Sequence, residues 1–260
     1  MTFVGFMLIV IAFILFFVRR NQKNKLKYLG LANSYTIKSL QNIVNQVAGE
    51  IGGGSLRDYI KIRGIIECDR PLISELKREL CVYYKMKVVR EYEEEVTKQN
   101  SEGKTITEIE KKTATISEKN RSTPFYITDE NQGILVDPEK ANIETIQVLD
   151  QFQTEDNLSN FSLELGLFGR QGKTIGYHHN ESILPLGYRV LVLGTATDED
   201  GVITIRQPTD SKKPFIISLK SEEQLTKETK NAIRWTFYGM LFCLTLGIII
   251  LIVRLFNSVG

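Results

Sequence analysis

The sequence has few of the residues that disulfides and metal centres need. Its 260 residues include three cysteines and two histidines, and Cys243 lies within a long apolar run. Disulfide-stabilised extracellular modules usually carry more cysteines, in even numbers. Cys68 and Cys81 could pair, but each is more typical of a small buried apolar residue. The cysteine count therefore argues against a disulfide scaffold.

The sequence also lacks an excess of charge of one sign and the common catalytic motifs. Its formal net charge is +2, so no basic field favours a nucleic-acid partner. No G-x-S-x-G, C-x-x-C or H-E-x-x-H pattern occurs. The triple glycine at 52–54 is not followed by the Lys-Ser/Thr of a phosphate-binding loop, so it predicts a hinge. The sequence therefore predicts no catalytic residues and no cofactor.

Long apolar runs stand at both ends of the sequence, at Thr2–Val18 and Ala232–Phe256. A membrane-spanning helix needs roughly 17–25 mostly apolar residues. The first run has no basic segment before it and no small-residue cleavage site after it, which argues against a signal peptide. We therefore expect a two-pass protein with transmembrane helices within 1–20 and 221–256. A buried core helix at each end is the alternative.

Basic residues near the two spans are distributed unequally. Only Arg254 lies on the outer side, whereas eight basic residues lie on the side of the central domain: Arg19, Arg20, Lys23, Lys25, Lys27, Lys227, Lys230 and Arg234. By the positive-inside rule, the domain faces the cytoplasm. The expected location is the cell or envelope membrane in a bacterium, or an organelle outer membrane in a eukaryote.

The central residues predict a mainly β (α+β) soluble domain. Residues 21–57 read as a basic neck, an amphipathic helix at 36–47 and the glycine hinge. Apolar and polar residues then alternate, as at Ile60 and Ile62 and again at 82–89, which is typical of strands with one buried face. We expect residues 58–220 to form a small barrel or sandwich. The polar segment 97–112 predicts a long, mobile hairpin loop, and 221–256 a capped helix continuing into the second span.

One cluster brings together both histidines, at His178 and His179, with Glu181 close behind. Two imidazoles and a carboxylate could bind zinc, and histidine could also sense pH. Adjacent strand residues point to opposite faces, however, so His178 and His179 would converge only in a tight turn. We therefore expect a solvated loop before a strand rather than a metal site. The acidic run Glu93–Glu95 is interpreted as a solvated, edge-protecting segment.

Several segments in order, between two terminal spans, resemble a known family. They are Ile62–Leu72, Cys81–Tyr84, Pro124–Asp129, Gly133–Pro138, Glu181, Leu186–Gly194 and Pro214–Ser218. This order is similar to the GIDE domain, also called the beside-a-membrane (BAM) domain. That domain occurs in RING-type E3 ubiquitin ligases of the mitochondrial outer membrane and chloroplast envelope, and in many bacterial proteins.

The resemblance implies a role in binding a protein partner beside the membrane. In the organellar ligases a RING follows the second span and holds two zinc ions, each with four Cys or His ligands. This chain has five Cys and His residues in total, so we expect a RING-less, bacterial-type homologue that acts as a non-catalytic adaptor. Two alternatives remain open: an E3 ligase component working with a separate RING protein, and a metal-dependent enzyme at His178 and His179. In the organellar ligases the domain faces the intermembrane space, which is in tension with the charge rule.

Overall fold

The computed structural model describes residues 2–51, 53–54, 56–99, 104–129, 132–154, 172–199 and 201–259. The chain forms two compact units. The barrel unit comprises Met1–Ile65, Tyr126–Ile143 and Arg189–Gly260, and the sheet unit comprises Ile66–Phe125 and Glu144–Tyr188. The segment 58–220 therefore contributes to both units.

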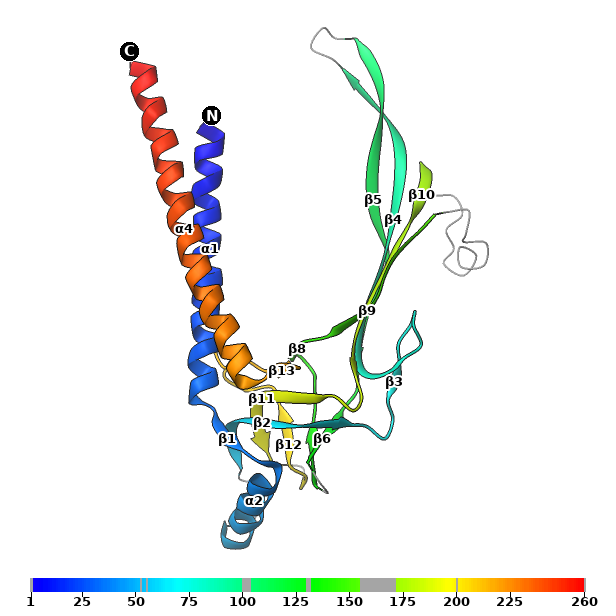
Figure 1. The fold of residues 1–260 in the computed structure, drawn as a ribbon, viewed down its shortest axis with the longest axis vertical. Helices are drawn as coiled ribbons and strands as arrows, with labels where there is room; N and C mark the ends of the chain where they lie inside the picture. The colour runs from blue at the N-terminus through cyan, green and yellow to red at the C-terminus, as the bar shows by residue number, and fades with distance from the viewer. Residues whose placement is uncertain are drawn as a thin grey trace. The chain divides into compact units, whose positions relative to one another are not determined.

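Both apolar ends are helices that are long and apolar enough to cross a membrane: α1 (Thr2–Leu31) and α4 (Glu222–Val259). Only 11% and 6% of their apolar windows are buried, which argues against buried core helices. The two helices run side by side, with both chain ends at the same end of the pair (Figure 1). A Cβ added at Gly247 would lie 3.1 Å from the carbonyl oxygen of Gly5, so small residues allow the two backbones to approach closely.

Local signals explain where the helices begin and end. The basic neck continues α1 as far as Leu31, and α2 (Ile37–Ile51) buries Ile37 and Leu40 as its amphipathic pattern predicts. At the start of α4, Ser221 and Gln224 each accept a hydrogen bond from the other's backbone N–H. This capping box confirms the predicted start. From there α4 continues without a break into the second apolar run.

Five strands of the barrel unit close into a ring, which confirms the barrel of the two predicted architectures, barrel or sandwich. Their order is β2 (Arg57–Glu67), β6 (Phe125–Asp129), β7 (Gln132–Val136), β12 (Thr204–Arg206) and β11 (Arg189–Thr197), and β11 pairs back onto β2. Three short strands extend the sheet: β1 (Asn33–Tyr35), β13 (Ile216–Ser218) and β8 (Asn142–Ile143). Ile62 lies opposite Val192 across β2 and β11, and both are fully or almost fully buried. Alternation along these strands therefore fills the ring with apolar side chains.

The outer face of the barrel holds the ends of both long helices. Leu29 of α1 and Leu225 of α4 pack with Tyr59, Leu191 and other buried residues of this face. Lys61 projects from β2 and is 12% exposed. Its Nζ donates to the carbonyl oxygen of Leu29 (3.2 Å) and pairs with Glu222 (2.6 Å). Because that carbonyl lies near the negative end of α1, one cation fastens both helices to the barrel.

The sheet unit is antiparallel. Its strands are β3 (Leu72–Ile73), β4 (Leu80–Gln99), β5 (Thr105–Ser122), β9 (Ile146–Thr154) and β10 (Lys173–Pro185). β10 lies between β9 and β4, while β5 and β3 pair with β4. The prediction of a mobile loop at 97–112 is wrong, because β4 runs to Gln99 and β5 begins at Thr105. Neither face of this stretch is buried, so it lacks the apolar alternation that indicates a strand.

Candidate functional site

The histidine cluster lies within a strand and not in a loop. His178 and His179 pair with Val89 and Val88 inside β10, so the prediction of a solvated loop is wrong. The two imidazoles take opposite faces, as alternation requires. The His178 side chain is 43% exposed, with its Nε2 atom 2.6 Å from the Asp150 carboxylate. His179 is buried, and burial, followed by the nearby His178, lowers its pKa.

Glu181 is fully buried and holds the turn between β3 and β4 in place. Its carboxylate accepts hydrogen bonds from the Ser74 hydroxyl (3.0 Å) and from the backbone N–H groups of Leu76 (2.9 Å) and Lys77 (2.8 Å). These donors occupy the carboxylate and hold the segment between β3 and β4. Within the described parts of the chain, no group of three His, Cys, Asp or Glu residues is placed to hold a metal ion. The structure therefore does not bring His178, His179 and Glu181 together as a ligand set.

The cysteines are free thiols. Cys81 is buried beside the Glu181 carboxylate, and its burial, reinforced by that charge, raises its pKa to about 11. The Cys68 thiol is partly exposed and donates to the carbonyl oxygen of Pro124 (3.5 Å). A thiolate is the reactive form of cysteine. The raised pKa keeps Cys81 protonated, and Cys68 is the more accessible of the two thiols.

The feature that sequence reasoning missed is a two-stranded arm. We define the arm as residues 91–99 of β4 with residues 105–113 of β5, which are paired from end to end. In Figure 1 these two strands continue together beyond the end of β10. Burial in β4 ends at Arg90, and no residue of β5 is buried. The arm is therefore a β ribbon without an apolar core.

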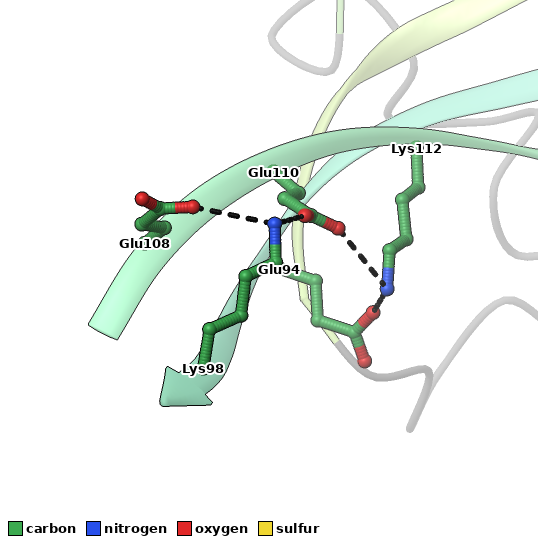
Figure 2. A network of polar contacts seen from close by, with 5 residues as sticks. All are labelled: Glu94, Lys98, Glu108, Glu110 and Lys112. Atoms are coloured by element: carbon green, nitrogen blue, oxygen red, sulfur yellow. Dashed lines mark hydrogen bonds and ion pairs between the residues drawn. The ribbon is translucent and has the colours of Figure 1, made fainter. Parts of the chain in front are cut away.

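Charged side chains link the two strands of the arm on one face. Figure 2 shows Lys98 paired with Glu108 and Glu110, and Lys112 paired with Glu94 and Glu110. Lys98 and Glu108 are 3.3 Å apart, and Lys112 and Glu94 are 2.7 Å apart. The hydrogen bond between Lys98 and Glu110 raises the pKa of the lysine and lowers that of the glutamate. Cross-strand ion pairs thus take the place of the apolar contacts that join strands elsewhere.

The base of the arm is held by Arg90, which is buried. Its Nε atom donates to the Thr174 hydroxyl (2.9 Å) and its guanidinium to the carbonyl oxygen of Gly172 (3.0 Å). The guanidinium carbon also lies 4.6 Å from the centre of the Tyr92 ring. β10 is thereby joined to β4 at the point where the buried core ends.

The other face of the arm combines an exposed apolar residue with acidic ones. Ile109 is 67% exposed and lies opposite Glu95 in the ladder. It lines a hollow of about 450 Å³ together with Glu93, Glu94, Glu95, Gly172 and Lys173. The predicted solvated acidic run is thus one wall of this hollow. The sequence signal that could have indicated the arm is the content of Thr and Ile, residues of high β-propensity, among the charged residues at 105–117.

Comparison with known proteins identifies the family. The GIDE family model, described as an E3 ubiquitin ligase, matches residues 93–253, which is more than half of the chain. Neither a curated protein nor a solved structure matches the chain. The matched region begins in the arm and extends into α4. The chain therefore belongs to the GIDE family.

Proposed function

We propose that the chain is a two-pass membrane protein whose GIDE domain binds a protein partner beside the bilayer, as a non-catalytic adaptor. The observation that carries this proposal is the arm. Among the described strands, β5 pairs with β4 alone, so its second edge is open along 18 residues. An open edge can accept an extended segment of another protein as an additional strand.

The chemistry of the hollow beside Ile109 indicates what that segment carries. Glu93, Glu95 and Lys173 line the hollow around the exposed isoleucine, while the Glu94 carboxylate pairs with Lys112 on the opposite face. A complementary segment would place an apolar side chain on Ile109 and a basic side chain near Glu93 or Glu95. Charged side chains along β5 are of the kind that protects edge strands from edge-to-edge pairing between copies of one chain. These features support a foreign partner over self-association.

The test is site-specific photo-crosslinking in native membranes with the full-length chain. A crosslinkable amino acid replaces Ile109 in one variant and Val202, which is 52% exposed in the barrel unit, in the other. We expect a discrete adduct from position 109 and none from position 202. The substitution Ile109→Asp should abolish co-purification of the adduct's protein, whereas Val202→Asp should not. Equal adducts from both positions, or an intact complex in Ile109→Asp, would overturn the proposal.

The same proposal places the domain on the cytoplasmic side, because eight basic residues near the spans lie on its side and one lies on the other. Cys68 provides a native reporter, since it is the partly exposed thiol outside the spans. A membrane-impermeant maleimide should label Cys68 in inside-out vesicles and leave it unlabelled in right-side-out vesicles. A Cys68→Ser variant gives the background, and the reverse pattern would place the domain outside.

A second candidate function follows from the description of the family model as an E3 ubiquitin ligase. In this case the chain would present substrates to a separate RING protein. Reconstitution with ubiquitin, activating and conjugating enzymes and a RING protein tests it. Ubiquitin modification of the substrate should rise when the full chain is added. With the Ile109→Asp variant it should return to the level seen with the RING protein alone. No increase over the RING protein alone would exclude this function.

A further inference from the structure

A second hollow, in the barrel unit, lies beside the neck of α1. It has a volume of about 580 Å³ and collects four lysines from three separate segments: Lys25 of α1, Lys140 between β7 and β8, and Lys212 and Lys213 between β12 and β13. Asn21 and Asn24 add amide groups on the helix side, and none of the described residues that line the hollow carries a carboxylate. We call it the juxtamembrane pocket.

Three of the four lysines of the pocket are not neutralised by acids in the described part of the chain. In the ranges that the structure describes, no carboxylate forms an ion pair with Lys140, Lys212 or Lys213. The acidic residue closest in sequence to Lys212 and Lys213 is Asp210, which accepts the backbone N–H of Lys212 (3.0 Å). Neither Asp210 nor Glu139, the neighbour of Lys140, lines the pocket. Lys213 is positioned by the Tyr59 ring, whose centre lies 5.2 Å from its Nζ atom. Unpaired cations of one sign around a concave surface attract an anion.

The backbone at Lys140 supports a role for its side chain. Its φ angle is +62°, a left-handed conformation that glycine and asparagine adopt far more readily than lysine. The turn is closed by a hydrogen bond from Ala141 N–H to the carbonyl oxygen of Pro138 (3.0 Å). A glycine would satisfy this turn with less strain. A lysine therefore stands where the backbone alone would favour another residue.

The position of the pocket along α1 matches the level of lipid headgroups. The apolar run ends at Val18, and Asn21–Lys25 follow it on the same helix. At 1.5 Å per residue, these side chains lie roughly 5–10 Å beyond the end of the span. The headgroup layer extends about 5–8 Å outside the hydrocarbon core. The pocket therefore opens at the depth where phosphate groups of the bilayer are found.

We propose that the juxtamembrane pocket binds the phosphate headgroup of an anionic membrane lipid. Lys140, Lys212 and Lys213 contact the phosphate oxygens, and the amide groups of Asn21 and Asn24 hold the adjoining polar part of the headgroup. Basic pockets at the membrane surface recognise anionic headgroups in this way. The bound lipid fixes the barrel unit at a defined height on the bilayer. This inference is independent of the partner bound by the arm.

Native mass spectrometry of the full-length chain in a neutral detergent tests the proposal. The chain is titrated with dioleoyl phosphatidic acid, with dioleoyl phosphatidylcholine as the neutral lipid and with inorganic phosphate as a competitor. The pocket variants are Lys212→Gln/Lys213→Gln and Lys140→Gly. The matched control is Lys227→Gln/Lys230→Gln, because these exposed lysines of α4 also lie between the barrel and the second span, beside Glu222 and Glu223.

We expect one phosphatidic acid per chain at low lipid concentration, and weaker binding by at least about tenfold in the double pocket variant. Lys140→Gly should weaken binding while leaving the melting temperature equal or higher, so a loss of affinity in this variant cannot be a loss of fold. Equal losses in pocket and control variants would show general surface attraction and overturn the proposal. Displacement of the lipid by inorganic phosphate at similar concentration would assign the site to a free anion, and would also overturn it.

Discussion

The barrel and the arm are both β structure, but different forces hold them. In the barrel, every ring strand buries apolar side chains, and the largely buried Lys61 fastens two helices. In the arm no residue is buried, and charged side chains span the two strands. Burying a large apolar side chain stabilises by about 1.5–3 kcal/mol, whereas exposed ion pairs contribute little. Stability is therefore concentrated in the barrel, and the proposed binding surface lies in the arm.

The difference predicts that an isoleucine-to-alanine substitution lowers stability strongly in the barrel and hardly at all in the arm. Ile62→Ala in the barrel should lower the free energy of unfolding by about 2–5 kcal/mol, because it leaves a cavity in a closed core. Ile109→Ala in the arm should leave it nearly unchanged, since that side chain is 67% exposed. Denaturant unfolding of the full chain in micelles measures both. Similar losses in the two variants would contradict the comparison.

Glu181 tests whether a buried charge of the sheet unit serves the fold. Glu181→Ala removes the acceptor of three hydrogen bonds and should cost about 2–4 kcal/mol of unfolding free energy. Glu95→Ala, in the exposed arm, is the matched control and should have little effect. A metal chelator should leave the unfolding of the unmodified chain unchanged. A chelator effect that disappears in Glu181→Ala would instead assign this carboxylate to a metal.

Lys61 tests how the helices are fastened to the barrel. Lys61→Met keeps the apolar stem but removes the cation shared by the end of α1 and Glu222. We expect a loss of about 1–2 kcal/mol. The exposed pair between Lys87 and Glu118 (3.5 Å) provides a control, because Lys87→Met should leave the unfolding midpoint unchanged. Equal losses of stability in Lys61→Met and Lys87→Met would mean that the buried contacts of Lys61 stabilise the fold no more than an exposed ion pair does.

The sequence predicted the structure best where burial sets a pattern. The spans, the capped start at Ser221 and the strands around Ile62 and Val192 were all predicted, because apolar periodicity or capping chemistry marks them. The sequence alone could not show that β11 returns to β2, or that β12 pairs with β7 in parallel, because these pairings join distant segments. The barrel was therefore predicted as a class and not as a topology.

Strands were predicted as loops in two situations: where neither face of the strand is buried, and where the buried face carries polar residues. The segment 97–112 was predicted to be a loop because its strand partners interact through charges. His178 and His179 were placed in a loop, although β10 buries His179 and Glu181 on its inner face. Buried polar residues interrupt the apolar alternation, so a strand that carries them reads as irregular. The candidate interaction surface could thus be recognised only once the ladder between β4 and β5 was known.

The smallest effect concerns the ion pairs of the arm. Glu110→Gln removes the carboxylate shared by Lys98 and Lys112, and it should leave the global unfolding midpoint unchanged. Amide hydrogen exchange in residues 94–99 and 105–110 should nevertheless quicken, because local opening of the ribbon no longer breaks these pairs. High salt should reproduce the effect in the unmodified chain by screening the charges. The variant should respond less to salt.

Acidification extends the same test, because the Lys98 contact lowers the pKa of Glu110 below its ordinary value of 4.5. A carboxylate with a lowered pKa stabilises the paired form fully above the ordinary value and loses this contribution as pH falls through the lowered one. Relative to model peptides, exchange in the arm should therefore accelerate on acidification below about pH 4.5, and exchange in the barrel strands should not follow it. A matching acceleration at Ile62 and Val192 would show that the arm and the barrel open together, and the division of stability between them would then be lost.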